Sequence, residues 1–279
     1  MSNAPVGIFD SGIGGLTVAR AIRELLPSES TIYLGDTARV PYGPKSPETV
    51  RRYSREILDW LLSQGVKAVV VACNTATAQA LDDLQARSPV SVIGVIEPGA
   101  RAAARASTTG AVGVIGTAGT VASGAYVRAL LGERADLRVV AQACPVLVPL
   151  VEEGWFDHPA TELAAREYLT PLLATDIDVL VLGCTHYPML SPLLGRIMGP
   201  SVQLIDSATE TARELARVLA ATGIAAASGS VTTQRWIATD DAARFARVGA
   251  VFMGADLRNV EVVEPASVEL SPERLEPHR

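Results

Sequence analysis

The chain has 279 residues, 48% of them hydrophobic, and its 24 basic and 30 acidic residues give a formal net charge of −6 at pH 7. This balance, without any basic run, excludes nucleic acid as the main partner, because nucleic-acid binders present a basic face to the phosphates. No apolar run approaches the roughly 18 residues that a membrane-spanning helix needs. The first residues lack the basic and apolar regions of a signal peptide, so we expect a cytoplasmic protein.

Short apolar runs alternate with segments of helical periodicity, which is typical of a parallel sheet with helices on both faces. Near the start of the chain, the pattern predicts strands at 6–9, 31–34 and 66–72 and helices at 16–26, 47–64 and 74–87. After residue 206 it predicts a helix at 209–221, a strand at 231–238, a short helix from 240 and a strand at 260–263. This last segment is too small for its own core. We expect it to pack on one half of the molecule and to fray over 265–279.

The chain repeats its own plan. A strand that enters a turn of small residues occupies 6–12 and recurs at 112–118, and the strand and turn at 69–75 recur at 180–186. The two offsets, 106 and 111 residues, are similar, and both pairs occur in the same order. The repetition predicts two similar halves with a few inserted residues. Valine-rich strands followed by glycine are common in α/β proteins, so chance is the alternative interpretation.

The three cysteines, Cys73, Cys144 and Cys184, are widely spaced and form no CxxC pair. Neither a disulfide framework nor a metal site is therefore predicted. The chain has only two lysines, Lys45 and Lys67, which leaves few anchors for a Schiff base with pyridoxal phosphate. Cys144 precedes a proline and has no predicted helix after it, so we interpret it as a buried core residue.

The most unusual residues of the sequence fall at predicted strand ends: Asp10 with Ser11, Cys73, and Cys184 with His186. In parallel sheets, ligands bind beyond these carboxyl ends. A cysteine between a strand and a helix N-terminus feels the helix dipole, so we expect a lowered thiol pKa at both cysteines. Either one could instead be a small core residue. Two cysteines at equivalent positions of two similar halves favour a functional pair.

The glycine-rich turn at 12–17 is similar to a dinucleotide-binding motif, with Thr17 in place of its third glycine and Asp36 as a candidate ribose-binding acid. The carboxylate of Asp10, directly ahead of the turn, would repel a pyrophosphate. The sequence therefore argues against a dinucleotide cofactor. The backbone donors of this turn could equally hold the carboxylate of a small substrate.

Among the three histidines, only His186 lies at a predicted site, where it could be a proton-transfer partner or simply a capping or packing residue. We interpret His158 and His278 as surface residues. Glu152 and its neighbour Glu153 fall at a predicted helix start and would ordinarily be solvated. Two thiols pointed at one carbon from opposite faces could remove a proton on one side and deliver one on the other, which inverts its configuration.

Six segments together resemble the glutamate racemases of the cofactor-independent aspartate/glutamate racemase superfamily, over about residues 6–265. They are GIFDSGIGGLT at 7–17, YLGDTA at 33–38, VPYG at 40–43, ACNTAT at 72–77, GTAGT at 116–120 and LGCTHYP at 182–188. The resemblance implies two similar doubly wound α/β domains with mainly parallel sheets and an active site in the cleft between them. It implies a first domain of residues 1–97 and 208–279 and a second of 98–207.

The same resemblance implies a cytoplasmic isomerase that interconverts L- and D-glutamate without a cofactor, supplies D-glutamate for peptidoglycan and forms a homodimer. Cys73 then corresponds to the base for the D-enantiomer and Cys184 to the base for the L-enantiomer. Asp10 assists Cys73, His186 assists Cys184, and Glu152 is a further supporting acid. These residues, except Glu152, are also expected to contact the substrate, together with Ser11, Pro41, Tyr42, Gly43, Asn74, Thr75, Thr117, Thr120 and Thr185.

Three alternatives stay open at this point. An aspartate racemase of the same superfamily would share these motifs, since spacing alone gives no pocket depth. A non-catalytic binding protein could close two α/β lobes over an amino acid, but would not need a thiol in each. A thiol redox protein is the third alternative. Its resolving cysteine normally lies close to the first, whereas Cys73 and Cys184 are expected on opposite sides of a ligand.

Overall fold

The computed structural model describes residues 1–265, and these residues form two separate sheets in which every strand pair is parallel. The first sheet has the strand order β10-β9-β2-β1-β3-β4 and the second has the order β6-β5-β7-β8. The strands of the first sheet are β1 (Val6–Asp10), β2 (Thr31–Gly35), β3 (Ala68–Val71), β4 (Ser91–Gly94), β9 (Gln234–Ala238) and β10 (Glu261–Val262). Those of the second are β5 (Ala111–Gly116), β6 (Arg138–Ala143), β7 (Val179–Gly183) and β8 (Gln203–Asp206).

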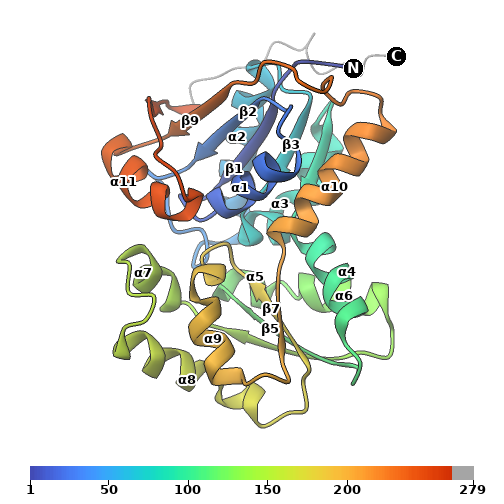
Figure 1. Cartoon of the computed structure of the whole chain (residues 1–279), viewed down its shortest axis with the longest axis vertical. Helices are drawn as coiled ribbons and strands as arrows, with labels where there is room; N and C mark the ends of the chain where they lie inside the picture. Colours follow the sequence, from blue (N-terminus) through green and yellow to red (C-terminus); the bar gives the residue numbers. More distant parts are fainter. Residues whose placement is uncertain (266–279) are drawn as a thin grey trace.

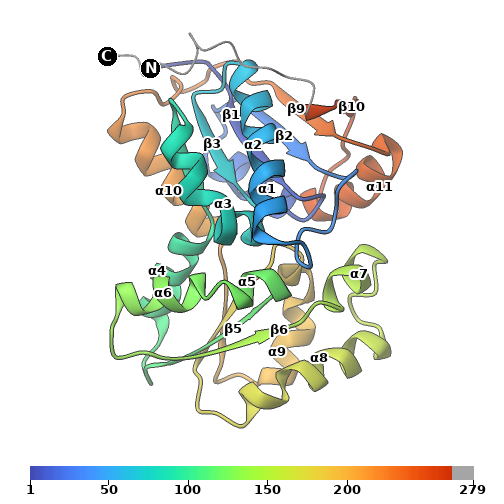
Figure 2. The ribbon, with the colours of Figure 1, turned by 180° about the vertical axis from the view of Figure 1, so that it is seen from behind.

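Helices cover both sheets, as the alternating sequence pattern predicts (Figures 1 and 2). Those of the first half and of the C-terminal segment are α1 (Leu16–Leu25), α2 (Pro47–Ser63), α3 (Asn74–Arg87), α4 (Ile96–Ala106), α10 (Ala208–Ala221) and α11 (Ala242–Met253). Those of the second half are α5 (Ala118–Ala122), α6 (Ala125–Glu133), α7 (Leu147–Glu152), α8 (Pro159–Leu173), the short 3₁₀ helix η1 (Tyr187–Leu190) and α9 (Ser191–Met198). Helix α1 packs with α10 and α11 on one face of the first sheet, and α2 packs with α3 on the other.

Local chemistry explains the start of α2. Ser46 is its N-cap and accepts a hydrogen bond from the backbone N–H of Thr49, and Pro47 occupies the first helical position, where a missing N–H costs nothing. The buried positions Val50, Ile57 and Leu61 recur at helical spacing and face the sheet. By contrast, β3 has the sequence AVVV and is buried on both faces, as expected of a central parallel strand.

The two sheets repeat one topology. The order β2-β1-β3-β4 in the first recurs as β6-β5-β7-β8 in the second. This confirms the expected fold class, with two similar halves. It also makes β3 and β7 equivalent strands, so that Cys73 after β3 and Cys184 after β7 occupy matching positions.

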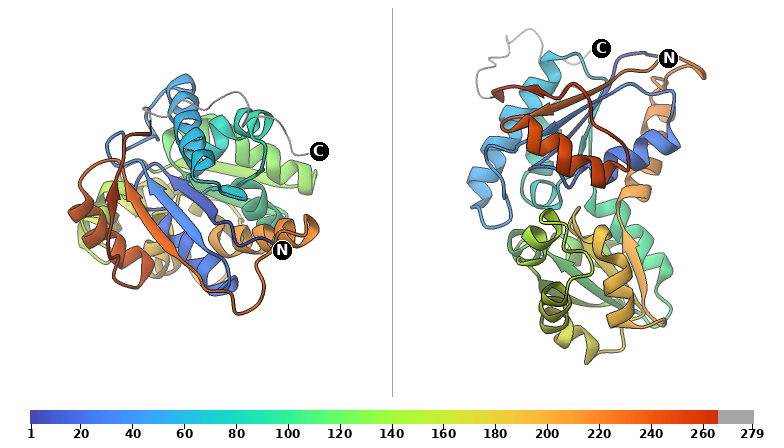
Figure 3. Two further views of the ribbon diagram at one scale, coloured as in Figure 1. Left: turned by 90° about the horizontal axis from the view of Figure 1, so that it is seen from above. Right: turned by 60° about the vertical axis from the view of Figure 1, so that its left-hand side comes forward.

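The C-terminal segment returns to the first sheet. Strand β9 pairs with β2, β10 extends the same edge, and α11 packs against α1 (Figure 3). The predicted strand at 231–238 begins later than expected, at Gln234, because the preceding residues lie in an exposed loop. The division into domains at 97/98 and 207/208 stays a prediction, and the expected frayed tail after residue 265 lies outside the described residues.

Candidate active site

A cavity of about 340 Å³ lies where strand ends of the two sheets face each other. Twelve of the fourteen predicted site residues line it: Ser11, Pro41, Tyr42, Gly43, Cys73, Asn74, Thr75, Thr117, Glu152, Cys184, Thr185 and His186. The sequence reasoning did not find the other lining residues, which are Val40, Pro44, Ala118, Pro145, Val148 and Pro149. These six carry no titratable group. Val40 and Ala118 fall within the segments VPYG and GTAGT, and Pro44 directly follows the first of these. No motif marks Pro145, Val148 or Pro149.

The two remaining predicted residues lie directly behind the lining. Asp10 ends β1, is 1% exposed, and accepts a hydrogen bond from the N–H of Gly12 at 2.9 Å on Oδ2. Its Oδ1 has no hydrogen-bond partner within the described residues, and burial raises the pKa of this carboxyl. Thr120 contacts the hydroxyls of Thr75 and Thr117 at 3.3 and 3.0 Å. Both residues therefore support the cavity wall.

Cys73 is the N-cap of α3, and its sulfur accepts a hydrogen bond from the N–H of Ala76 at 3.4 Å. The hydroxyl of Ser11 lies 3.6 Å from the same sulfur. The expectation of a lowered pKa is wrong for this thiol. Burial and then the nearby carboxylate of Asp10 raise the pKa of Cys73 to about 12, and the helix N-terminus offsets only part of the lost hydration.

Cys184 has a different set of neighbours. Its sulfur lies 3.8 Å from Nδ1 of His186, and Nε2 of the same ring lies 3.1 Å from Oε1 of Glu152. Burial lowers the pKa of His186, but the hydrogen bonds to Cys184 and Glu152 outweigh it and raise the pKa to about 10. A protonated imidazole therefore lies beside the Cys184 sulfur at neutral pH.

The interpretation of Glu152 as a solvated residue at a helix start is wrong. It is the last residue of α7, its side chain is 13% exposed, and its Oε2 accepts from Nη2 of Arg244 at 3.1 Å. Arg244 belongs to α11, far away in the sequence, and no motif marks it. His158 is indeed exposed and caps α8, whereas His278 lies outside the described residues.

One wall of the cavity presents polar groups to a substrate. Oδ1 of Asn74 accepts a hydrogen bond from the hydroxyl of Tyr126 at 2.7 Å, which fixes the amide, and Nδ2 is buried without a partner among the described residues. The hydroxyls of Thr75 and Thr117 lie 2.8 Å apart beside it. A buried amide N–H₂ and two hydroxyls are suited to a carboxylate, because a buried donor left unpaired is costly.

The loop that carries Pro41, Tyr42 and Gly43 is held from behind by Asp36. This buried carboxylate accepts hydrogen bonds from Arg39, from the hydroxyl of Tyr42 and from Thr239. Asp36 is therefore fully engaged and does not serve as a ribose-binding acid. The Tyr42 hydroxyl is engaged as well, so this residue lines the cavity with its ring and backbone.

Cys144 does not line the cavity, and its interpretation as a core residue agrees with its position. The sulfur is buried, burial raises its pKa to about 12, and its backbone carbonyl accepts from the hydroxyl of Tyr187 at 2.8 Å. Within residues 1–265 there is no cluster of three or more His, Cys, Asp or Glu side chains suited to a metal ion. Over the same residues, no helix is long and apolar enough to cross a membrane.

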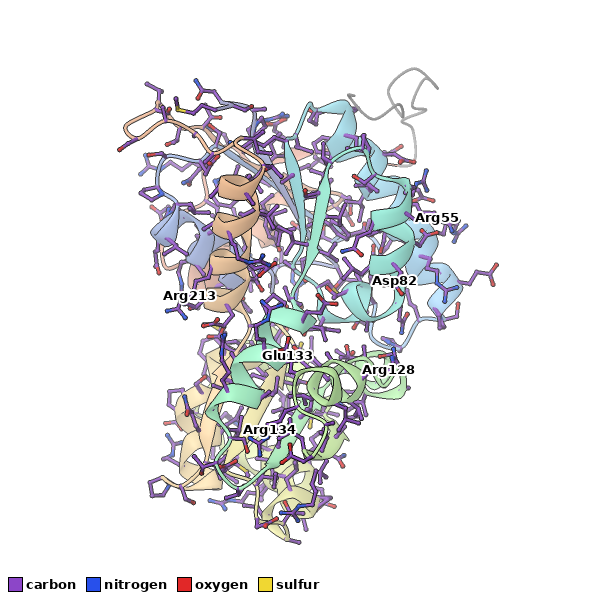
Figure 4. All side chains as sticks on the ribbon, turned by 90° about the vertical axis from the view of Figure 1, so that its right-hand side faces the viewer. Arg55, Asp82, Arg128, Glu133, Arg134 and Arg213 are labelled. Atoms are coloured by element: carbon purple, nitrogen blue, oxygen red, sulfur yellow. The ribbon has the colours of Figure 1, made fainter. Side chains whose placement is uncertain are left out.

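A second cavity, of about 490 Å³, lies between α3, α4 and α6, and its lining includes Asp82, Arg128 and Glu133 (Figure 4). It contains no thiol, histidine or hydroxyl cluster comparable to the first. The chemistry of proton transfer therefore belongs to the first cavity, where thiols from two equivalent strand ends meet the same space.

The fold and this cavity define an α/β enzyme of two similar halves that places one thiol from each half at a shared small-molecule site. The chain belongs to the Asp/Glu/hydantoin racemase family, whose model matches residues 16–215. Glutamate racemase from Syntrophus aciditrophicus (strain SB) is 49% identical over 260 residues, which are 93% of this chain and 96% of the relative.

Solved structures agree with this membership. Glutamate racemase isoform RacE1 from Bacillus anthracis superposes with a TM-score of 0.92 at 41% identity, covering 95% of this chain and 99% of that chain. Glutamate racemase from Francisella tularensis subsp. tularensis SCHU S4, solved in complex with D-glutamate, superposes with a TM-score of 0.90 at 34% identity, covering 96% and 100%.

Proposed function

We propose that this protein is an amino-acid racemase that interconverts L- and D-glutamate by proton transfer between two cysteines, without pyridoxal phosphate. The observation that carries the proposal is the single cavity lined by both Cys73 and Cys184, at equivalent ends of β3 and β7. Curated relatives that match more than nine-tenths of this chain at about half identity are named glutamate racemase, which favours glutamate over aspartate.

The protonation of the site residues suits one direction of the reaction. The high pKa of Cys73 keeps it a thiol at neutral pH, whereas the sulfur of Cys184 has the protonated imidazole of His186 beside it. Cys184 can then take the α-proton of L-glutamate while Cys73 delivers its proton to the opposite face. The original Cα–H bond breaks and a new Cα–H bond forms on the opposite face. After D-glutamate departs, the proton is on Cys184 and Cys73 is deprotonated.

Holding the substrate and stabilising the carbanion fall to fixed polar groups. We assign the Nδ2 of Asn74 and the hydroxyls of Thr75 and Thr117 to a substrate carboxylate, because they are buried donors on one wall. Asp10, whose Oδ1 has no hydrogen-bond partner among the described residues, lies behind the lining on the Cys73 side, and we assign it a supporting role there. Enclosure of the reacting carbon away from water strengthens each of these interactions.

The further roles follow the proposed activity. We propose a cytoplasmic enzyme that supplies D-glutamate for peptidoglycan and so serves cell-wall biogenesis and cell shape, and that works as a homodimer. Gel filtration with light scattering tests the dimer. Loss of growth on depletion, restored by D-glutamate in the medium, tests the cell-wall role.

Solvent exchange tests the activity itself. In D₂O without added cofactor, both glutamate enantiomers should racemise and incorporate deuterium at Cα. A non-catalytic binding protein would bind glutamate without exchange. Cys73→Ala and Cys184→Ala should each abolish racemisation, and Cys144→Ala should retain it. Racemisation at the original rate in either of the first two variants would exclude the two-thiol mechanism.

A further inference from the structure

Helix α11 supplies a charged side chain that the reaction described above does not use. Nη2 of Arg244 lies 3.1 Å from Oε2 of Glu152, and the other oxygen of this carboxylate faces Nε2 of His186. Helix α11 belongs to the segment that returns to the first sheet, whereas Glu152 ends α7 in the second half, and the two helices face each other in Figure 1. The ion pair therefore links the two halves on the Cys184 side of the cavity.

The side chain of Arg244 is more exposed than the two groups that it holds in place. Its side chain is 41% exposed, against 13% for Glu152 and 6% for His186. A partly exposed ion pair contributes little to folding stability. Its consequence lies in geometry, because a carboxylate bound at one oxygen by the guanidinium presents its other oxygen to the imidazole.

The same helix also contacts the imidazole itself. The ring of Phe252 lies edge-to-face against His186, with centroids 5.4 Å apart and an interplanar angle of 79°. Phe252 is fully buried, so the plane of the histidine is fixed by packing. Helix α11 thus holds two successive members of the series Glu152, His186 and Cys184.

We propose that Arg244 is a positioning residue for the proton transfer at Cys184, an inference that rests on the proposed racemase function. Arg244 fixes Glu152 as the acceptor of the Nε2 hydrogen bond of His186, which directs Nδ1 at the Cys184 sulfur. No proton passes through the guanidinium. On the other side of the cavity, Asp10 bonds to Gly12 and Ser11 lies beside Cys73, and within residues 1–265 neither forms a hydrogen bond or ion pair with Arg244.

This asymmetry has a kinetic signature. The reaction has two proton transfers in sequence, one at each thiol, and Arg244 bears on one of them. Because the equilibrium constant between enantiomers is fixed, kcat/KM must fall equally in both directions. The substrate isotope effect, in contrast, need not change equally for the two enantiomers. With L-glutamate, Cys184 removes the labelled proton in the slowed step, so the isotope effect rises. With D-glutamate, Cys73 removes the labelled proton in a step that no longer limits the rate, so the isotope effect falls.

The experiment compares Arg244→Ala with the unaltered full chain, using circular dichroism and glutamate carrying protium or deuterium at Cα. We expect kcat/KM to fall roughly 10- to 100-fold, the range found for residues that orient metal-bound histidines. The isotope effect should increase with L-glutamate and decrease with D-glutamate, as it should in His186→Asn. Ser11→Ala, on the Cys73 side, should give the opposite pattern. Arg244→Lys should recover part of the rate, since it keeps the charge.

The matched control is Arg247→Ala, an exposed arginine on the same helix, which should behave as the unaltered protein. An unchanged kcat/KM in Arg244→Ala, or an isotope effect that shifts equally for both enantiomers, would overturn the role of Arg244. If Arg244→Ala does not fold, Arg244→Gln is read by the same two criteria. Failure of the unaltered chain to racemise glutamate would instead overturn the proposed function.

Discussion

Gly14 and His186 approach each other so closely that a Cβ added at Gly14 would lie 2.5 Å from Nδ1 of the imidazole and 2.3 Å from the hydroxyl of Thr185. Gly14 belongs to the turn after β1 of the first half, and His186 follows β7 of the second. The glycine therefore allows the two halves to meet at the nitrogen that faces Cys184.

Gly14→Ala should displace His186 from Cys184. Because the neighbours of the new methyl group are side chains that orient the thiol, we expect kcat to fall by roughly 10²- to 10⁴-fold, the usual contribution of a positioned acid–base group. The free energy of unfolding should fall by only about 1–3 kcal/mol, as for other overpacked sites. Steady-state kinetics and a thermal melt on the same preparation check both. Activity near that of the unaltered protein would mean that the ring does not need its present position.

The raised pKa of His186 predicts a pH dependence of stability. A histidine whose folded pKa is about 10 binds its proton more tightly in the folded state than in the unfolded state, where the ordinary value is about 6.5. Its contribution is complete below pH 6.5 and is lost as pH rises through 10. Urea unfolding from pH 6 to 10 should show this loss, and His186→Asn should flatten it. If the free energy of unfolding of His186→Asn still falls with pH to the same extent, the pH dependence comes from other groups.

Sequence pattern predicted what local chemistry determines. The central strands β1, β2, β3, β5 and β7, the repeated plan and the placement of Cys73 and Cys184 at strand ends follow from apolar runs and turn residues, and the fold confirms them. The pattern did not predict the strands β4, β6 and β8. The thiol pKa of Cys73 did not follow, because its burial is a tertiary property that outweighs the local helix N-terminus. Arg244 was missed because its partner Glu152 lies 92 residues away and meets it only when the chain returns.

One lysine that sequence left without a role, Lys67, forms a buried ion pair. Its Nζ lies 2.6 Å from Oε2 of Glu29, both side chains are 4% exposed, and the ammonium also donates to the carbonyls of Ser2 and Ile224. Lys67→Met should lower the free energy of unfolding by roughly 3–5 kcal/mol, because it leaves a buried carboxylate unpaired. The double variant Lys67→Met/Glu29→Gln should recover much of this loss. Equal stability of the single and double variants would show that the unpaired carboxylate of Glu29 is not the cause of the lost stability.

Asp36 offers a test of how the substrate loop is held, since it receives the hydroxyl of Tyr42, the guanidinium of Arg39 and the hydroxyl of Thr239 without lining the cavity. Asp36→Ala removes the carboxylate that accepts from all three donors, so the loop should lose its fixed position and KM for glutamate should rise more than kcat falls. Tyr42→Phe removes one donor and leaves the carboxylate two partners, so its effect on KM should be smaller. Initial rates over a range of glutamate concentrations measure both. A fall in kcat at constant KM would contradict a loop role and point to a contribution of Asp36 to the proton transfer.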